Sequence, residues 1–575
     1  MVINQNNLQT LHYSKSIQSL IKRFIKPYPT NVEYMRRLDE ELKIIEQKGF
    51  VRCFKQVSEI MRLSQGIPHL LRGSAASSLV CYYLGISNID PIKNNIPLAR
   101  FMNHTRDDQP DIDIDFPHWI RDEIIDRLHE RYPGQVARIS NRVMYKPKSA
   151  LREALRVFGY RKFLPKNFKL NKVVKDSEER RRIREYAESL VGQQRMWSLH
   201  CGGVIVYNDK VPQDIMLDAS RSQLAIDKYD VEKQNLIKID LLCNRGLSQL
   251  WEMNDTPLHQ YPTEDKLTSQ LLCKGDVLGL TQSESRTMRK TLIALQPKSM
   301  YDVALALALI RPAAADGGKK ASYLRHWQQG EYKKQIIYDE DSINYISKTI
   351  GCNDSDADKY RRAFANQQEG RIRQFVEKIK DHDNKEKIIN NLNQLSKYSF
   401  CKGHALAYGQ MVWALAYNKA RDKKTFWKAT LKHCNSSYRK WVHMREAHVA
   451  GVELYNHAKG SSIQQFNKTG WWDDTKFLPD MGLQKENNVI YFKGLIANSR
   501  RIYRYGNKLM LMSIGVDNGK LIDLIIKGTP QWGGFQVAEG RGVMKENLGS
   551  WYVETNEIFF TNLPNSKEEY LSKFW

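Results

Sequence analysis

The sequence lacks the features that mark several large classes of protein. Its eight cysteines lie far apart and none forms a C-x-x-C pair, so it predicts neither a structural zinc site nor a disulfide framework. No apolar run approaches the ~18 residues that a membrane span needs. The N-terminal segment MVINQNNLQTLHYSKS lacks the apolar core of a secretory signal. We therefore expect no membrane association and a reducing, cytoplasmic environment.

Acidic residues are too few to balance the basic ones. The 89 Lys and Arg exceed the 64 Asp and Glu, which gives a formal net charge of +25. A soluble protein this basic usually meets a polyanion, because each phosphate that it neutralises releases condensed counterions. The 12 Trp and 28 Tyr supply faces on which bases can stack. A basic surface that serves only solubility is the plainer alternative, and composition does not separate an enzyme from a protein that coats nucleic acid.

The 575 residues predict several domains, and hydrophobic periodicity outlines their elements. Helical patterns cover 31–49, 119–131, the basic stretch 142–184, 285–310 and 370–430, a glycine-centred turn and helix cover 68–92, and strands are expected at 109–116, 203–207 and 236–242. After about residue 487 the pattern becomes β, with turn signals between the runs. That change predicts a separate small barrel.

The sharpest local signal is the segment PDIDIDF, residues 110–116. Successive side chains of a strand point to opposite faces, so Asp111, Asp113 and Asp115 share one face while the apolar residues between them face a core. Neighbouring carboxylates on that face stand about 7 Å apart. Like charges this close are tolerated when a cation lies between them, and hard oxygen ligands favour Mg²⁺. The pattern therefore indicates a site for the two metal ions of phosphoryl transfer.

Three other interpretations of the segment PDIDIDF are an EF-hand loop, a solvated edge strand and the D-x-D motif of a sugar transferase. An EF-hand loop needs Gly at its sixth position and Glu at its twelfth. This sequence has Phe116 and Asp122 there, which excludes an EF-hand. A solvated acidic edge strand would not need apolar residues on its other face. The segment alone leaves open a sugar transferase with a metal-binding D-x-D.

Two further segments bear on the same chemistry. Residues 236–242, LIKIDLL, alternate as a strand and place Lys238 and Asp240 on one face. A strand carboxylate at Asp240 would complete a three-Asp metal site, which is a hypothesis about pairing in space. In RGSAASSL, residues 72–79, glycine and small residues let the backbone approach a phosphate, and the amides of the following helix can bind an anion. Many Gly-Ser turns are plain helix caps, so this one gains weight only because the carboxylate strand follows it.

Together these segments resemble the C family of bacterial DNA polymerases, to which the alpha subunit of DNA polymerase III belongs. The Gly-Ser turn and QPDIDIDF match that family in order and spacing. They are followed by similar segments KPKSALREALRVFG, SLHCGGVIV, IKIDLL, LTQSESRTMRKTL, DVALALALIRP and YSFCKGHALAYGQMVWALAYNKA. The resemblance runs from about residue 31 to 555, and several motifs in collinear order are more specific than any one of them.

The resemblance implies an α+β multidomain fold. Its parts would be a nucleotidyltransferase palm related to DNA polymerase beta, helical thumb and fingers, and a C-terminal OB-fold barrel beginning near YFKGLIANSRRIYRYGNK. The implied boundaries are an N-terminal arm over 1–30, palm over 31–142 and 196–249, thumb over 143–195, fingers over 250–440, a shortened helical linker over 441–488 and the OB-fold over 489–575. The family's phosphoesterase-like, exonuclease and clamp-loader-binding segments have no counterpart in the sequence, so we expect a shortened enzyme without proofreading.

The resemblance also implies roles for individual residues. Asp111, Asp113 and Asp240 would be the catalytic ligands of two Mg²⁺ ions, with Mn²⁺ as a substitute, and Asp115 falls outside that set. The residues expected to bind the incoming nucleotide are Arg72, Gly73, Ser74, Arg286, Arg289, Arg311, Lys402, His404 and Tyr408. The residues expected to bind DNA are Lys146, Lys148, Arg152, Arg156, Arg161 and Lys162 near the thumb, and Tyr503, Arg504 and Tyr505 in a loop of the barrel.

The sequence departs from the family pattern around the expected nucleotide pocket. Ser77 replaces a glycine, Cys401 and Gly403 replace Asn and Ser, Ala313–Ala314 replace Gly-Pro, and Pro68–Leu71 replace a glycine-rich approach to the Gly-Ser turn. These changes bear on the shape of the pocket, the rate and the fidelity, and they remove no metal ligand.

The hypothesis is a template-directed DNA polymerase that adds dNTPs to a primer 3′-hydroxyl. It would act on primer–template DNA in a bacterial cytoplasm or nucleoid, including that of a phage-infected host, with a clamp or single-strand-binding protein as candidate partners. The rival hypotheses are a catalytically inactive, polymerase-like scaffold and a primase or other nucleotidyltransferase. A requirement for both primer and template would separate a polymerase from the last two.

Overall fold

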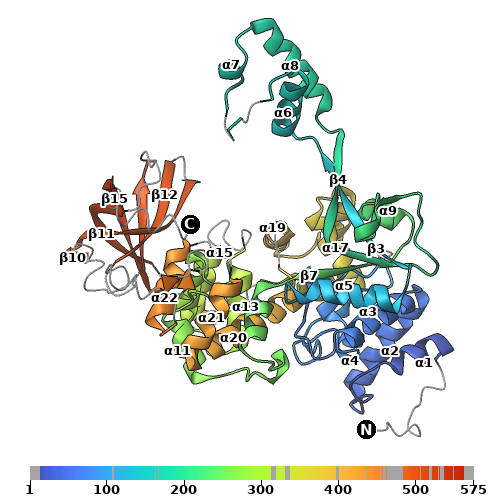
Figure 1. The fold of residues 1–575 in the computed structure, drawn as a ribbon. Coiled ribbons are helices and arrows are strands. Elements are labelled where there is room, and N and C mark those ends of the chain that lie inside the picture. The colour runs from blue at the N-terminus through green and yellow to red at the C-terminus, as the bar shows by residue number, and fades with distance from the viewer. Residues whose placement is uncertain are drawn as a thin grey trace. The chain divides into compact units, whose positions relative to one another are not determined.

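The computed structural model forms two compact units, residues 1–121 with 243–575 and residues 122–242 (Figure 1). The residues that it describes are 13–105, 109–161, 164–165, 168–311, 319–329, 337–396, 400–434, 436, 438–452, 455–456, 461–462, 483–504, 507–516, 521–528, 530, 537–547 and 549–561. Over these residues, no helix is both long and apolar enough to cross a membrane.

The first unit opens with three helices, α1 (Lys15–Ile21), α2 (Val32–Gln47) and α3 (Val51–Leu63). The side chain of Asn31 caps α2, and the stripe of Leu38, Leu42 and Ile45 is fully buried. This confirms the amphipathic helix expected over 31–49, since a helix with one apolar stripe is stable only when that stripe is buried.

A short antiparallel pair of strands follows, β1 (Leu70–Arg72) and β2 (Ile112–Phe116), with Arg72 opposite Asp113. Between them lie the 3-10 turn η3 (Gly73–Ser77), α4 (Leu79–Tyr83) and η4 (Leu98–Arg100). Ile112, Ile114 and Phe116 have no exposed surface, so the alternate face of β2 is packed in a core as the alternation predicts.

The remainder of the first unit up to Val449 is mostly helical, as expected for 285–310 and 370–430. The helices are α10 (Arg245–Met253), α11 (Lys266–Cys273), α12 (Arg286–Leu295), α13 (Met300–Leu309), α15 (Lys319–Gln328), α16 (Asp339–Ile350), α17 (Asp354–Ala365), α18 (Glu369–Lys378), α19 (Lys385–Ser396), α20 (Lys402–Arg421), α21 (Lys423–His433) and α22 (Lys440–Val449), with η6 (Leu258–Gln260) after α10. Its largest apolar core includes the buried faces of α13 and α20. The two helices cross closely, because a Cβ on Gly409 would lie 2.8 Å from the Cβ of Ala304.

The C-terminal part of this unit is a small closed barrel, as the β pattern predicts. Its strands are β10 (Leu483–Glu486), β11 (Val489–Arg504), β12 (Asn507–Gly515), β13 (Leu521–Lys527), β14 (Val537–Asn547) and β15 (Ser550–Thr561), in the sheet order β10-β11-β12-β13-β15-β14. Pairing of β11 with β14 closes the barrel around an apolar core. In the region 441–488, expected to be a helical linker, the described residues form α22, the strand pair β8 (Tyr455–Asn456) and β9 (Ser461–Ser462), and β10, which pairs with β11, so the barrel sheet begins before residue 489.

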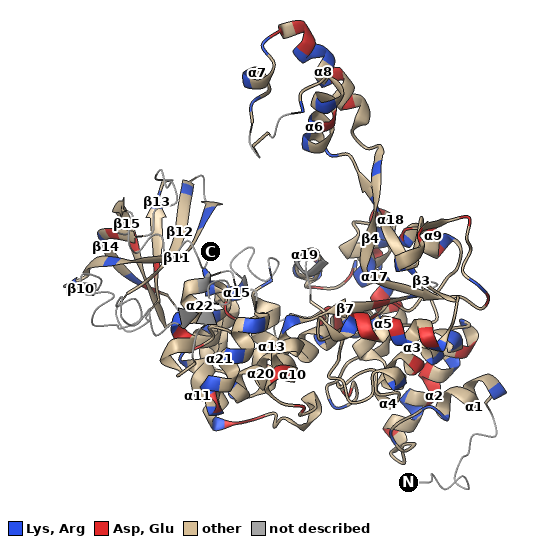
Figure 2. Ribbon diagram, in the orientation of Figure 1, with Lys and Arg blue, Asp and Glu red and all other residues tan. Residues whose placement is uncertain are grey.

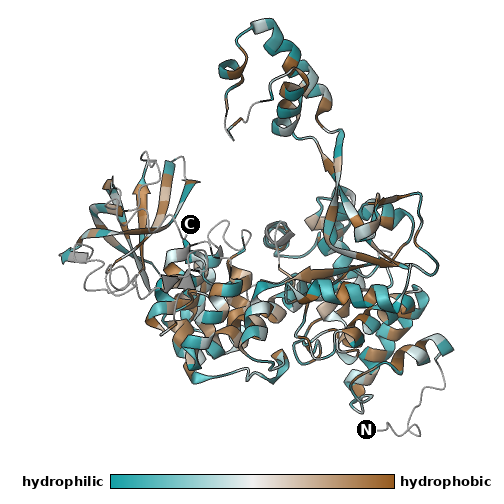
Figure 3. Ribbon diagram, in the orientation of Figure 1, coloured by the Kyte–Doolittle hydropathy of each residue, from teal (hydrophilic) through white to brown (hydrophobic). Residues whose placement is uncertain are grey.

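The second unit combines a sheet with a small helical group. Strands β3 (Val136–Met144), β4 (Gln194–Val206), β5 (Met216–Asp218), β6 (Gln223–Leu224) and β7 (Lys238–Cys243) lie in the order β7-β4-β3-β6-β5, accompanied by α9 (Lys228–Lys233) and most of α5 (Ile120–Arg131). Apolar stretches of these strands are brown in Figure 3. Helices α6 (Pro147–Val157), α7 (Leu170–Val173) and α8 (Ser177–Leu190) stand between β3 and β4 in the chain and share their own apolar core.

Two glycines allow β4 to approach its neighbours closely. A Cβ on Gly202 would lie 2.5 Å from the backbone oxygen of Leu241, and one on Gly203 would lie 2.6 Å from the side chain of Ile139. Backbone oxygen cannot move aside as a flexible side chain can. The SLHCGGVIV segment therefore needs glycine at residue 202 in order to pair next to the strand that carries Asp240.

We predict that Gly202→Ala lowers the free energy of unfolding by about 1–3 kcal/mol, the usual cost of overpacking. The matched control is Gly370→Ala in α18, where a Cβ meets nothing within 4 Å. The control should change stability by no more than about 1 kcal/mol, and in the stabilising direction. Urea denaturation of both variants measures the difference, and equal stabilities would contradict the close approach of β4 and β7.

Candidate functional site

The three carboxylates of β2 and its approach lie in graded environments. Asp111 is exposed, Asp113 is half-buried and Asp115 is 1% exposed. Carboxylate oxygens of Asp111 and Asp113 come within 4.8 Å of each other. Two carboxylates that share a face at this distance, with access to solvent, can take a hard cation between them.

Arg72, at the end of β1, faces these carboxylates. Its Nε lies 3.5 Å from Oδ2 of Asp113 and 3.7 Å from Oδ1 of Asp115. Burial favours the neutral form of the guanidinium, but the charges of Asp115 and Asp113 outweigh it and raise the pKa of Arg72. The structure thus brings the predicted nucleotide-binding Arg72 beside the predicted metal ligands of the same unit.

Asp115 binds side chains from two distant parts of the chain. The Tyr408 hydroxyl of α20 donates to its Oδ2 at 2.6 Å, and Nδ2 of Asn244, before α10, donates to the same oxygen at 2.8 Å. Burial raises the pKa of Asp115, while these hydrogen bonds and Arg72 oppose the shift. The sequence analysis placed Tyr408 in the site but gave Asp115 no role and missed Asn244, since no local pattern shows which side chains meet across the fold.

An aromatic stack connects Tyr408 with the Gly-Ser turn. The rings of His404 and Tyr408 lie 4.6 Å apart and nearly parallel, and Phe400 meets His404 edge-on. The amide of Gly73 donates to Nδ1 of His404 at 3.2 Å. Burial, then Arg311 and Arg72, lower the pKa of His404 to about 4, so the ring is neutral at pH 7 and its Nδ1 can accept this bond.

The Gly-Ser turn differs from the expectation in one respect. Gly73 has a φ of +77°, which glycine adopts without strain, but the turn continues as η3 and α4 begins only at Leu79. The amides at the start of α4 are already occupied, because Glu41 accepts from the amides of Leu79 and Val80 at 2.8 and 3.0 Å. The prediction that this helix N-terminus binds the phosphate was therefore wrong, and the turn at Gly73 and Ser74 is the segment left to do so.

Lys402 and Arg311 surround the same turn in different ways. Nζ of Lys402 donates to the backbone oxygen of Asn94 at 2.7 Å, whereas the exposed Arg311 packs its guanidinium over the ring of Phe400 at 4.7 Å. Lys402 is thus engaged by the protein, and Arg311 presents its charge to solvent beside the His404 stack.

A buried acid supports the other side of the turn. Glu340 accepts from the amide of Lys402 at 2.9 Å and lies 3.4 Å from Sγ of Cys401, which in turn donates to the oxygen of Gly73 at 3.2 Å. Burial, and then the charge of Asp339, raise the pKa of Glu340 to about 7. Cys401, where the family pattern has Asn, thus links this acid to the turn.

Asp240 lies on β7 in the second unit. Nζ of Lys238 lies 2.8 Å from its Oδ2 and Nδ1 of His200 lies 3.8 Å from its Oδ1, so Lys238 and Asp240 do share a face. The amides of Gly202 and Gly203 donate to Nδ1 of His200 at 3.2 and 2.7 Å. Oδ1 of Asp240 is buried and accepts no hydrogen bond from the described residues, which suits an atom that receives a cation.

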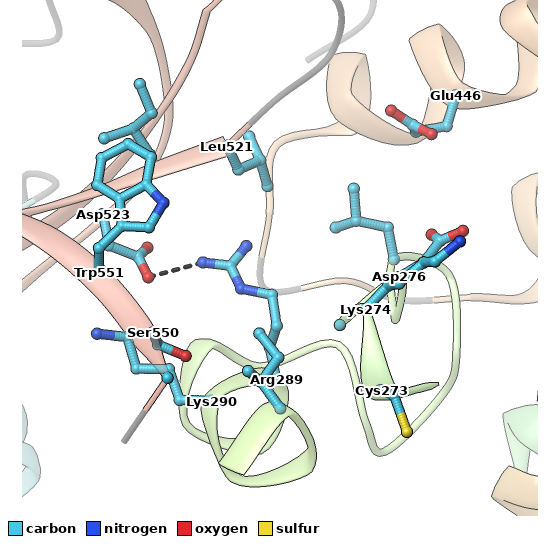
Figure 4. Close-up of a pocket in the computed structure, with 15 residues that line it drawn as sticks. Cys273, Lys274, Asp276, Arg289, Lys290, Glu446, Leu521, Asp523, Ser550 and Trp551 are labelled. Atoms are coloured by element: carbon cyan, nitrogen blue, oxygen red, sulfur yellow. Dashed lines mark hydrogen bonds and ion pairs between the residues drawn. The ribbon is translucent and has the colours of Figure 1, made fainter. Parts of the chain in front are cut away.

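Arg286 and Arg289 lie in a place that the sequence did not indicate. Nη2 of Arg289 lies 2.6 Å from Oδ2 of Asp523 on β13 (Figure 4), and Nε of Arg286 lies 3.0 Å from the same oxygen. Burial alone would raise the pKa of the Asp523 carboxyl, but the charges of Arg289 and Arg286 outweigh burial and lower it. The three residues fasten α12 to the barrel beside a cavity of about 590 Å³. Their positive charge is directed at Asp523, and neither arginine lies free to bind a triphosphate.

The predicted DNA-binding side chains differ in their surroundings. Lys146, Lys148, Arg156 and Arg161 are exposed on or beside α6, where Figure 2 shows basic residues. Arg152 instead donates to the backbone oxygens of Leu164 and Pro165 at 2.9 and 2.8 Å, so it secures a loop. In the barrel Tyr503 is 71% exposed. Lys162, the side chain of Arg504 and Tyr505 lie outside the described residues.

Two models of known protein families match this chain. The model of the bacterial DNA polymerase III alpha NTPase domain matches residues 9–243, and that of the alpha subunit finger domain matches residues 244–387. This chain belongs to the bacterial DNA polymerase III alpha family. The two matched segments contain the carboxylate strand, β7 and the helices up to α18, in the order that the sequence motifs indicate.

The sequences of relatives in this family align with about two thirds to three quarters of the chain. An error-prone DNA polymerase of Bordetella parapertussis is 27% identical over 452 residues, which cover 69% of this chain and 43% of the relative. The error-prone DNA polymerase of Corynebacterium glutamicum is 30% identical, with 67% and 40% covered, and the DNA polymerase III subunit alpha of Thermotoga maritima is 28% identical, with 76% and 52% covered. The matches span about two fifths to one half of the length of these polymerases.

The raised pKa of Glu340 makes the stability of the site depend on pH. An acid whose pKa rises on folding, here from 4.5 to about 7, stabilises the fold below pH 4.5, and this contribution is lost as pH rises through 7. We predict that Glu340→Gln removes this dependence. Relative to the wild type, the variant should gain about 3 kcal/mol in free energy of unfolding between pH 4.5 and pH 8.5.

Urea denaturation at the two pH values measures this gain. The control is Glu369→Gln, which changes an exposed carboxyl in α18 and should leave the pH dependence as it is in the wild type. A Glu340→Gln variant whose pH profile follows the wild type would show that Glu340 ionises normally.

Proposed function

We propose that this chain is a DNA-directed DNA polymerase that adds dNTPs to a primer 3′-hydroxyl on a template strand. The observation that carries the proposal is the carboxylate pair Asp111 and Asp113, next to Arg72 and the turn at Gly73. Phosphoryl transfer needs carboxylates that bind metal ions and a positively charged side chain that binds phosphate oxygens. The first unit holds both, because Asp111 and Asp113 lie next to Arg72. Membership in the polymerase III alpha family agrees with this reaction.

Asp240 is proposed as the third metal ligand. The chain that carries it re-enters the first unit at Cys243, and the next residue, Asn244, donates its amide to the oxygen of Phe116 at 2.8 Å. The carboxylate that Asp240 offers on a strand, together with membership in the polymerase III alpha family, supports the proposal.

The donor set suits Mg²⁺, with Mn²⁺ as a substitute, because all three proposed ligands offer carboxylate oxygen. Two such ions, when bound, activate the 3′-hydroxyl and neutralise the charge that develops on the triphosphate. Lys238, whose Nζ lies 2.8 Å from Oδ2 of Asp240, would be displaced when Asp240 becomes a ligand.

The protein's own groups would bind and orient the triphosphate. Arg72 supplies a planar donor for phosphate oxygens, and the turn at Gly73 and Ser74 brings backbone close to them. Arg311 and Lys402 add charge on the fingers side, and the His404–Tyr408 stack gives the nucleoside an apolar wall. Positioning of this kind supplies much of the rate in phosphoryl transfer, since the protein forms no covalent intermediate.

The remaining regions would hold DNA. We propose that β1, β2 and the strands of the second unit form a palm of the DNA polymerase beta type, that α6–α8 form the thumb, α10–α21 the fingers and β11–β15 an OB-fold. Exposed Lys146, Lys148, Arg156 and Arg161 would contact backbone phosphates of the primer–template, and Tyr503 would stack on single-stranded template. A clamp or single-strand-binding protein in a bacterial or phage-infected cell would be its natural partner.

Primer extension tests the proposal directly. We predict template-dependent extension by the wild type with Mg²⁺ and all four dNTPs, and a loss of about 10²–10³-fold or more in rate for Asp111→Ala, Asp113→Ala and Asp240→Ala, because each removes charge stabilisation at the reacting phosphate. Asp255→Ala, which changes an exposed Asp outside the site, should extend primers as the wild type does.

The rival functions give different results in the same assay. Synthesis without a primer indicates a primase, and addition without a template indicates another nucleotidyltransferase. Tight binding of primer–template without extension in Mg²⁺ or Mn²⁺ indicates a scaffold and contradicts the proposed enzyme.

The proposed thumb makes a separate prediction about salt. Replacing both Lys146 and Lys148 by Ala should weaken primer–template binding about equally for all sequences, and should lower the slope of log affinity against log salt by about 2. Fluorescence anisotropy over a range of KCl concentrations measures the slope. The control is Lys48→Ala in the first unit, and an unchanged slope for the double variant would exclude these lysines from the DNA interface.

A further inference from the structure

We infer that Asp115 is a positioning residue, which holds Arg72 and Tyr408 in place for the incoming triphosphate, and that it does not bind metal. The inference rests on the proposed function and assigns a role within the same site. It starts from a contrast on one strand face, where Asp111 and Asp113 are accessible and Asp115 is 1% exposed. A carboxylate this deeply buried must be satisfied by groups of the protein.

Both oxygens of Asp115 are directed at such groups. Oδ2 accepts from the Tyr408 hydroxyl at 2.6 Å and from Asn244 at 2.8 Å. Oδ1 is buried and accepts no hydrogen bond from the described residues, but it faces the positive guanidinium of Arg72, whose Nε lies 3.7 Å away and whose charge opposes a cation at this oxygen. These partners come from α20, from the residue before α10 and from the end of β1, three segments far apart in the chain. An oxygen that already accepts two short hydrogen bonds has little capacity left for a cation.

Arg72 is shared between a proposed metal ligand and Asp115. Its guanidinium lies between Asp113 at 3.5 Å and Asp115 at 3.7 Å. Once the charge of Asp113 is taken up by a cation, the attraction between Asp113 and Arg72 falls. Asp115 would then keep Arg72 beside the site, where its guanidinium fork can donate to phosphate oxygens.

Tyr408 links Asp115 to the Gly-Ser turn. Its hydroxyl is held by Asp115, its ring is stacked on His404, and Nδ1 of His404 accepts from the amide of Gly73. A chain of contacts thus runs from β2 to the backbone expected to approach the triphosphate. Release of Tyr408 would loosen both the wall of the nucleoside pocket and this turn, and would leave the metal ligands unchanged.

Kinetics of single-nucleotide incorporation test the inference. Asp115→Asn keeps the shape but removes the charge, and we expect the KM for dNTP to rise about 10–100-fold, the effect of losing hydrogen bonds to a charged group. We expect kcat to change less than about fivefold and the Mg²⁺ concentration for half-maximal rate to stay the same. Tyr408→Phe, which removes only one hydroxyl, should raise the KM about 3–10-fold. The control is Tyr417→Phe on the same helix, whose ring packs against Tyr261 and Arg421 outside the site, and it should match the wild type.

Three results would overturn the inference. A Mg²⁺ requirement raised in Asp115→Asn as in Asp113→Asn would make Asp115 a metal ligand. If both Asp115→Asn and Tyr408→Phe lower kcat, primer–template affinity and melting temperature together with the rise in KM, the contacts only support the fold. Unchanged kinetics would remove any role.

A binding measurement separates this inference from the proposed function. Calorimetric titration of dNTP into the complex with a dideoxy-terminated primer–template, in Ca²⁺ so that no turnover occurs, reports triphosphate affinity without chemistry. The inference predicts weaker binding by Asp115→Asn than by the wild type, even if no extension is seen. Equal affinities, or no binding by the wild type, would contradict it.

Discussion

The site depends on one constraint, the burial of the Asp115 carboxylate. The two other carboxylates on the same face of the strand, those of Asp111 and Asp113, are accessible. Asp115 is held at the inner end of β2 because Ile112, Ile114 and Phe116 anchor the opposite face in a core. A buried negative charge costs several kcal/mol unless hydrogen bonds and an opposite charge satisfy it. Arg72, Asn244 and Tyr408 supply both, and the strand that offers Asp111 and Asp113 to a cation is thereby joined to the groups proposed to bind the triphosphate.

The same principle recurs where other parts of the first unit meet. Asp523 on the barrel is buried and paired with Arg286 and Arg289, and Glu41 is buried against Ser78 and the first amides of α4. Glu340 connects α16 with the start of α20 and, through Cys401, with Gly73. Each buried acid fixes one junction between elements, so the geometry of the nucleotide site depends on charges that lie around it as well as on those within it.

The part of the site that follows from local pattern was predictable. Strand alternation alone placed Asp111 and Asp113 together and paired Lys238 with Asp240, and apolar periodicity located α2, α12, α13, α20 and the barrel strands. The partners of Asp115 and of the α4 amides were not predictable, because Asn244, Tyr408 and Glu41 meet them through tertiary packing. Arg286 and Arg289 look like phosphate ligands in sequence, but only the fold shows that a carboxylate of the barrel takes their charge. The Sγ of Cys401 likewise meets the oxygen of Gly73 and Glu340 only through tertiary packing.

The central claim is that Asp111, Asp113 and Asp240 hold the divalent cations of a polymerase. The most direct measurement counts Mn²⁺ bound per chain by electron paramagnetic resonance, in the complex with a dideoxy-terminated primer–template and dNTP. The account predicts two ions in the wild type, and loss or marked weakening of at least one in Asp113→Asn and in Asp240→Asn, with Asp255→Asn unchanged. Absence of bound Mn²⁺ in the wild type, or equal binding by all four proteins, would contradict it.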